Sequence, residues 1–295
     1  LGGGTLMAFG PSDETSASTV TLLANRGITL TAASGLAATT NNSGAYIDIL
    51  NINGVVTGSF PLTINGAAQG GKVVLNGVNT FGQTGSPYSG AVISGGTLQI
   101  GGSGTWTNAI ANTLSIAAGA VFQYSSSASS TVVGVISGGG SIVKDTSATS
   151  TLSFLGANSF TGGTTVRAGT LYISDASGFG SGTVTLGDTS GSNAAGLSIA
   201  NTITVPNNIV LNSNGTLSIA TAGGWAVTMS GSITGSNNLA LNATSNTALT
   251  LSGAVNNSGT VINNGAGSAT NIISGTIGSN VTGITQNSTT SAVSY

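Results

Sequence analysis

The chain has 295 residues, of which 48 are glycine and only 3% are Asp, Glu, Lys or Arg, giving a net charge of −2. This composition excludes nucleic-acid binding, which depends on a surface rich in Lys and Arg. Cysteine and histidine are absent, which removes disulfides, thiol chemistry and the commonest general base and metal ligand. The chain is too apolar for a disordered protein, and it contains no apolar run long enough to span a membrane as a helix.

The N-terminal residues 1–71 share the composition of the rest of the chain but show no clear repeat. They open on "LGGGTLMAF", without an initiating Met and in the middle of a motif that returns later as "SGGTL" (94–98), so we expect a processed or excised piece. Residues 11–18, "PSDETSAS", hold the densest charge in the chain. We interpret residues 1–71 as divergent N-terminal coils.

A repeat becomes visible from residue 72 onward. The segments "VVLNGVNTF" (73–81) and "VISGGTLQI" (92–100) return as "LSFLGANSF" (152–160) and "TVRAGTLYI" (165–173). Each reads as a short strand, a glycine corner and another strand, and such self-similarity is typical of solenoids.

A weaker copy relates a later pair of segments, "GVISGGGSIVKDTSATSTLSFLGA" (134–157) and "GSITGSNNLALNATSNTALTLSGA" (231–254). One continuous fold is therefore predicted, with repeat units over 72–133, 134–230 and 231–295, the last of them cut off within a repeat.

Apolar residues alternate with polar ones in the C-terminal half, as in strands with one buried face. The alternating pairs are Val184/Leu186, Leu197/Ile199, Ile203/Val205, Ile209/Leu211, Leu217/Ile219, Val227/Met229, Leu239/Leu241 and Leu249/Leu251. Turn-forming Gly, Asn, Ser and Thr separate the pairs, and no segment shows a helical period. The fold class is therefore all-β.

Strands this short, joined by polar corners, predict a β-solenoid of about a dozen coils at about 20–25 residues each, in which each coil pairs with the coils above and below it. Inward apolar residues would stack into columns, with Thr and Ser keeping the outer faces wet. A sandwich or jelly roll is the competing all-β architecture, and it does not predict repeats of corner and strand.

The segment "LSFLGANSFTGGTTVRAGTLYISDASGFGSGTVTLGDTSGSNAAGLSI" (152–199) resembles the autotransporter-associated passenger strand repeat. The resemblance is close over 134–199, looser over 72–101, and in register over 231–262. It implies a right-handed parallel β-helix on the outside of a bacterial cell, part of a stalk, adhesin or surface fibre. The family repeat carries no catalytic residues to transfer.

Few residues have side chains suited to catalysis or to ligand binding. We predict no catalytic, cofactor-binding or metal site and no enzymatic activity. Asp175 and Asp188 could lie on neighbouring corners near Arg167, as a polysaccharide-active enzyme would need, but each reads equally as a solvated turn residue. The pair Lys144–Asp145 reads as an exposed turn. Calcium-binding solenoids need an Asp in every repeat, and the glycine clusters here lack that spacing.

Five aromatic residues have two interpretations, inward packing or an outward stacking surface for sugar rings or a partner protein. Alternation with inward Leu171 and Ile173 places Tyr172 outward, and for the set as a whole we favour packing in the core or in a groove: Tyr88, Trp106, Tyr124, Tyr172 and Trp225.

The expected function is structural: an extracellular module of a bacterial surface fibre that stacks head to tail with copies of itself into filaments. Strand edges at the two ends would carry this assembly, since the C-terminal segment "NVTGITQNSTTSAVSY" (280–295) has no charge to block it. The alternatives are an adhesin that binds glycan or a matrix partner, and a carbohydrate-active β-helix.

Overall fold

The computed structural model describes residues 1–9, 16–40, 46–65, 70–82, 90–106, 113–212, 214–244 and 246–295. Two compact units make up the chain. Unit 1 consists of Leu1–Val143 with Asn158–Gly162, and unit 2 consists of Lys144–Ala157 with Gly163–Tyr295.

Unit 1 is built from short strands. They are β1 (Thr5–Ala8), β2 (Thr19–Leu22), β3 (Ile28–Leu30), β4 (Ser34–Ala38), β5 (Ile49–Ile52), β6 (Val56–Gly58), β7 (Leu62–Ile64), β8 (Lys72–Leu75), β9 (Val78–Asn79), β10 (Ala91–Ile93), β11 (Thr97–Ile100), β12 (Thr105–Trp106), β13 (Leu114–Ile116), β14 (Val121–Tyr124), β15 (Ser130–Val132) and β16 (Ile136–Gly138), followed by β17 (Ser141–Lys144), whose last residue belongs to unit 2.

Unit 2 continues in the same manner. Its strands are β18 (Thr151–Phe154), β19 (Thr164–Val166), β20 (Gly169–Ile173), β21 (Val184–Leu186), β22 (Ala195–Ile199), β23 (Ile203–Val205), β24 (Ile209–Leu211), β25 (Leu217–Thr221), β26 (Val227–Met229), β27 (Ile233–Gly235), β28 (Leu239–Ala243), β29 (Leu249–Leu251), β30 (Gly259–Asn263), β31 (Asn271–Ile273), β32 (Val281–Gln286) and β33 (Val293–Ser294).

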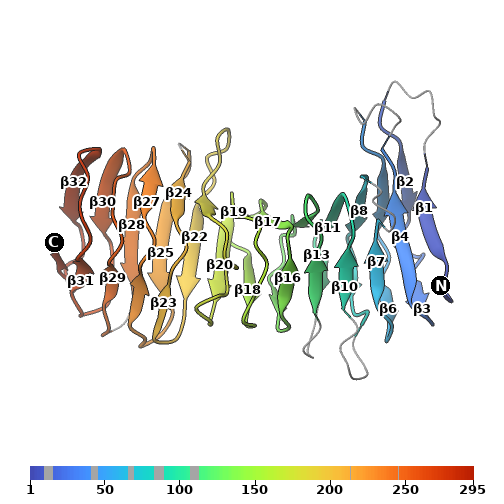
Figure 1. The fold of residues 1–295 in the computed structure, drawn as a ribbon, viewed down its shortest axis with the longest axis horizontal. Helices are drawn as coiled ribbons and strands as arrows, with labels where there is room; N and C mark the ends of the chain where they lie inside the picture. The colour runs from blue at the N-terminus through green and yellow to red at the C-terminus, as the bar shows by residue number, and fades with distance from the viewer. Residues whose placement is uncertain are drawn as a thin grey trace. The chain divides into compact units, whose positions relative to one another are not determined.

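Strands in unit 1 pair with strands one coil away rather than with their neighbours in sequence (Figure 1). One face of the unit runs β1-β4-β7-β10-β13-β16, and a second runs β2-β5-β8-β11-β14. The third face carries the pairs β3-β6 and β9-β12. Because every one of these registered pairs is parallel, the chain must return to the same end of the sheet after each strand.

Unit 2 repeats this three-faced arrangement. Its faces run β18-β20-β22-β25-β28-β30-β32, β19-β21-β24-β27 and β23-β26-β29-β31-β33. The register places like residues above one another: Leu171 pairs with Leu197, Leu197 with Ile219, and Ile219 with Leu241. Such columns fill the interior of the unit.

The predicted alternation of inward and outward side chains is seen along the strands. In β20 and β25, buried and half-buried residues alternate without a break. Of the predicted apolar pairs, all members are buried except Ile203, which is half-buried at the start of β23. Burial of alternate residues is the main source of stability for a chain with so few charges.

Glycine is required where a corner of one coil presses on the coil before it. Gly138 has φ +102°, and a Cβ placed there would lie 2.1 Å from the carbonyl oxygen of Ile116. Gly235 has φ +107° and the same close approach, 2.1 Å, to the carbonyl oxygen of Leu211. Any other residue at these corners would strain the backbone and push adjacent coils apart.

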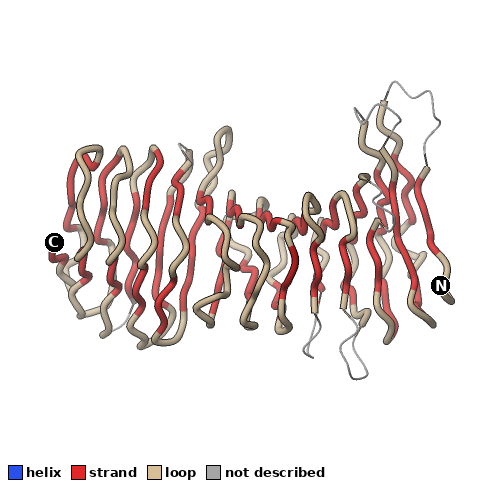
Figure 2. The backbone as a smooth tube through the Cα atoms, viewed as in Figure 1, coloured by secondary structure: helices blue, strands red, loops and turns tan. Residues whose placement is uncertain are grey.

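The fold prediction is confirmed. The described part of the chain contains strands and loops without a helix (Figure 2), stacked as a β-solenoid of about ten turns against the dozen expected. The right-handed sense remains a prediction, supported by the strong preference of parallel crossovers. Among the described residues, no helix is long and apolar enough to cross a membrane.

Candidate functional sites

The two acids considered for catalysis lie at separate corners of unit 2. Asp175 follows β20, and its Oδ1 accepts hydrogen bonds from the amide (2.9 Å) and hydroxyl (2.6 Å) of Ser177. Asp188 follows β21, and its Oδ1 accepts from the amide of Thr189 (2.7 Å). Each carboxylate therefore stabilises its own turn. The exposed Arg167 follows β19, which pairs with β21 in parallel register, so it lies at the same corner as Asp188 one coil away.

Metal-ligating side chains do not gather in the described part of the chain: no three Asp, Glu, His or Cys residues lie close enough together to hold an ion. The glycines of segments 101–106 and 180–188 lie in the corners next to β12 and β21. Gly102 and Gly180 adopt φ +58° and +69° there, so these glycines serve the backbone geometry of the turns.

The prediction of an exposed turn at Lys144 is wrong. Lys144 is fully buried at the end of β17. Its Nζ donates hydrogen bonds to Ser150 Oγ (2.8 Å) and to the carbonyl oxygen of Thr146 (3.0 Å). Burial lowers the pKa of Lys144 to about 8, and the charge of the neighbouring Asp145 opposes this shift. The loop after β17 folds back over the side chain and encloses it.

The loop that encloses Lys144 has two unusual features. Ser147 adopts a left-handed conformation with φ +60°. Buried Ser150 directs its Oγ toward two carbonyl oxygens of the same loop, those of Thr146 (3.2 Å) and Ser147 (3.4 Å). Gly169 makes room for the ammonium group, because a Cβ there would lie 2.6 Å from Lys144 Nζ. Sequence reasoning missed this cluster, since only the fold brings Ser150 back to Lys144.

Interior asparagines are a second feature that the sequence did not reveal. Asn79 is fully buried in unit 1; its Oδ1 accepts from the amide of Val56 (3.0 Å), and its Nδ2 donates to the carbonyls of Gly77 (2.7 Å) and Thr105 (3.2 Å). One side chain thus links three successive coils. Other buried asparagines that bond to neighbouring coils are Asn65, Asn158, Asn207, Asn257, Asn263 and Asn271.

The aromatic residues divide between the interior and the surface. Trp106 is buried in unit 1, stacked on Phe81 with ring centroids 5.1 Å apart, and it meets Phe122 edge-on at 6.3 Å. Tyr124 is also buried, and its hydroxyl donates to the carbonyl of Ala128 (2.7 Å). Inward packing is correct for these two.

The remaining aromatic residues do not follow that prediction uniformly. Trp225 is 46% exposed in unit 2, where its ring lies over Gly223 in the corner between β25 and β26. Tyr172 is half-buried on β20. Tyr88 lies outside the described residues, as do the acids Asp13 and Glu14 of the charged N-terminal segment.

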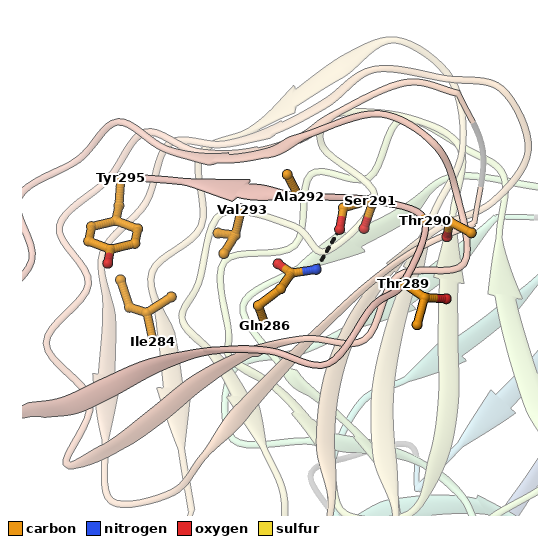
Figure 3. Close-up of a pocket in the computed structure, with 8 residues that line it drawn as sticks. All are labelled: Ile284, Gln286, Thr289, Thr290, Ser291, Ala292, Val293 and Tyr295. Atoms are coloured by element: carbon orange, nitrogen blue, oxygen red, sulfur yellow. Dashed lines mark hydrogen bonds between the residues drawn. The ribbon is translucent and has the colours of Figure 1, made fainter.

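The last described coil of unit 2 pairs with a neighbouring coil on one side. Strands β32 and β33 are the final members of their faces, and a pocket of about 530 Å³ lies between them (Figure 3). Gln286 spans the pocket floor, donating to the carbonyls of Ser291 (2.5 Å) and Ser288 (2.6 Å). Ile284, Val293 and the exposed Tyr295 form the apolar side of this pocket.

The first coil of unit 1 likewise pairs with a neighbouring coil on one side among the described residues. Strands β1, β2 and β3 each stand first in their faces, with one strand partner apiece among the described residues. Leu6 of β1 pairs with buried Leu36 and is itself half-buried, so it extends an interior column to the end of the unit.

Comparison with known protein families finds a match to the repeats of strand and corner. Two segments, residues 68–100 and 149–173, match the passenger-associated-transport-repeat. The first passenger repeat covers β8, β9, β10 and β11, and the second covers β18, β19 and β20. Both lie in stacked parallel coils, which agrees with the passenger-type β-helix that this repeat implies.

The predicted resemblance is therefore confirmed, with its two best segments at the matched positions. The copy over 231–262 stays a prediction. No curated protein and no solved structure matches the chain.

Proposed function

We propose that the chain is a non-enzymatic structural module of a bacterial surface fibre, secreted to the cell exterior, which stacks end to end with copies of itself. The passenger repeats support the extracellular, passenger-type role. The observation that carries the assembly step is the chemistry of the outer strand edges in the first and last described coils. A strand edge exposes unpaired N–H and C=O groups that favour pairing with a further strand.

Proteins that avoid such pairing place charge on their edge strands, usually Lys. Here β1 (TLMA), β2 (TVTL), β32 (VTGITQ) and β33 (VS) carry no charged side chain. The first and last coils expose different strands, so the contact is heterologous. A heterologous contact that does not close on itself generates an open filament.

Charge placed at the end of an interior column tests this proposal. Ile284 pairs with buried Val261 and is half-buried in the last coil, so Ile284→Lys is tolerated in a single module but would be buried in a filament. Leu6→Lys makes the same change in the first coil. We expect the wild-type chain to form filaments in electron micrographs of a concentration series and each variant to remain single.

A mixture of the two variants provides the sharper result. Each variant retains one intact end, so an equimolar mixture should form pairs and stop there, as measured by analytical ultracentrifugation. Ile284→Val and Leu6→Val, which keep the columns apolar, should assemble like the wild type. Single wild-type modules at every concentration, or filaments formed by the Lys variants, would contradict end-to-end stacking.

Trp225 favours a second function, an adhesin that binds glycan through the side of unit 2. Residues 189–295 contain no charged side chain, so this exposed indole stands among hydroxyls and amides. An aromatic face surrounded by such groups suits a neutral sugar ring, which stacks through its C–H face and hydrogen-bonds through its hydroxyls.

Fluorescence of the variant Trp106→Phe tests this function, since Trp225 is then the sole indole. Titration with neutral oligosaccharides (cello-, malto- and chito-oligomers) should shift its emission with saturation, and Trp225→Ala should abolish binding in calorimetry. A flat titration with every neutral oligomer argues against the glycan function and leaves the structural one standing.

A further inference from the structure

One peptide carbonyl of unit 2 lies between two strong donors. The oxygen of Thr146 accepts hydrogen bonds from Lys144 Nζ (3.0 Å) and from Ser150 Oγ (3.2 Å). Both donors are buried, at 0% and 2% exposure, and the ammonium also holds Ser150 Oγ at 2.8 Å. An ammonium and a hydroxyl that converge on one oxygen stabilise negative charge there, and they do so more strongly when water is excluded.

The residue after this carbonyl carries a nucleophile. Ser147 is half-exposed, and its backbone is left-handed, a region that non-glycine residues seldom occupy. Its Oγ lies 3.2 Å from Thr149 Oγ1, at the exposed side of the loop. A serine hydroxyl can attack the carbonyl carbon of the preceding residue through a five-membered ring, and a polarised carbonyl lowers the barrier to this attack.

We propose that the chain cleaves its own backbone between Thr146 and Ser147, with Ser147 Oγ as the nucleophile and with Lys144 Nζ and Ser150 Oγ binding the oxyanion. In the first step a bond forms between Ser147 Oγ and the Thr146 carbonyl carbon. The C–N bond breaks, and the hydroxyl proton passes to the Ser147 nitrogen, which leaves as an amine. The product is an ester between the two residues.

Water completes the reaction. It adds to the ester carbonyl, the ester C–O bond breaks, and Thr146 becomes a carboxylate while Ser147 regains its hydroxyl. One peptide bond and one water are consumed, with no change in oxidation state. Because Thr146 and Ser147 are half-exposed, water can reach the ester while the two donors stay buried. The substrate is part of the chain, so the reaction needs no substrate cleft.

The experiment follows the intact mass of the full folded chain over days under denaturing readout. We expect two fragments, 1–146 and 147–295, whose masses sum to that of the chain plus one water. Neutral hydroxylamine attacks esters much faster than amides, so it should accelerate cleavage and leave a hydroxamate on Thr146. The urea-unfolded chain should show neither product, because the donors are then dispersed.

Four variants separate this reaction from contaminating proteolysis. Ser147→Ala should abolish both products, and Ser147→Cys should retain them, through a thioester. Lys144→Met should slow cleavage by about 10²-fold, the usual effect of losing one oxyanion donor. Ser153→Ala, which removes a half-exposed hydroxyl from the adjoining β18, should leave the rate unchanged. A folded wild-type chain that keeps a single mass with hydroxylamine, or equal cleavage of Ser147→Ala, would overturn the proposal.

Discussion

Lys144 is the buried cation of this molecule, and Asp48 is the only other charged side chain buried among the described residues. A buried ammonium is costly unless hydrogen bonds satisfy it, and here Ser150 and the Thr146 carbonyl do so. The cost still appears in its pKa, which burial lowers from 10.5 to about 8. Between these two values the folded chain binds fewer protons than the unfolded chain, so raising the pH stabilises the fold in that window.

The stability of unit 2 should therefore increase as the pH rises from about 7.5 to 9.5, with a limit of about 3 kcal/mol over the full shift. Chemical denaturation followed by circular dichroism measures this change. The range ends below the titration of Tyr124, whose pKa burial raises above its usual 10.0. In Lys144→Met the increase should vanish; an unchanged pH slope in that variant would show that another group titrates.

At the scale of the element, the coil is held together by backbone pairing and by asparagines that face inward. A strand of three or four residues contributes few ladder bonds, and its corners leave backbone groups unpaired. Asn79 forms hydrogen bonds to three backbone groups in three coils, those of Val56, Gly77 and Thr105. The side chain replaces ladder bonds at the corner where β9 is only two residues long.

Asn79→Ala should destabilise unit 1 by about 2 kcal/mol, because it removes the hydrogen bond to the buried N–H of Val56 and one bond each to the carbonyls of Gly77 and Thr105. The neighbouring Val78, 54% exposed on the same strand, supplies the matched control, and Val78→Ala should change stability by less than about 0.5 kcal/mol. Urea unfolding in a Trp225→Phe background isolates the signal of buried Trp106. Equal effects of the two substitutions would mean that the asparagine bonds contribute nothing net.

Local alternation was enough to predict the strands but not the orientation of every side chain. The pairs from Val184 to Leu251 were predictable because a period of two depends only on neighbours in sequence. Trp106 and Trp225 both follow glycine-containing corners, yet one is buried and the other exposed. The difference lies in the adjacent coils: Phe81 and Phe122 stand next to Trp106 and enclose it. A single sequence contains no direct signal for that contact.

The same reasoning explains why the cluster at Lys144 was missed. Alternation along "SIVK" places Lys144 inward with Ile142, in agreement with the structure. However, Lys144 stands next to Asp145 at the end of a strand, and two adjacent charged residues there are typical of an exposed turn. Its burial depends on the loop returning Ser150 over the ammonium, a contact across six residues. The sequence contains both residues but gives no indication that they are in contact.

Across the whole molecule, solubility rests on hydroxyls and amides. The cations number four in the entire chain, at Arg26, Lys72, Lys144 and Arg167, and no acid follows Asp188. Outward positions carry neutral polar groups instead, as where Asn76 Nδ2 donates to the side chains of Asn51 (2.7 Å) and Asn53 (2.8 Å). Little electrostatic repulsion then opposes the approach of two copies, which is consistent with the proposed stacking.

The scarcity of Lys and Arg has a consequence for proteolysis. Trypsin-like proteases cut after Lys or Arg, and residues 168–295 contain neither. A stable fold resists such enzymes only while it stays folded, since cleavage then requires local opening. In this stretch the resistance persists after unfolding, because the cleavable residue is missing. Trypsin-like enzymes therefore have no site within these C-terminal coils, folded or unfolded, and the last residue after which they can cut is Arg167.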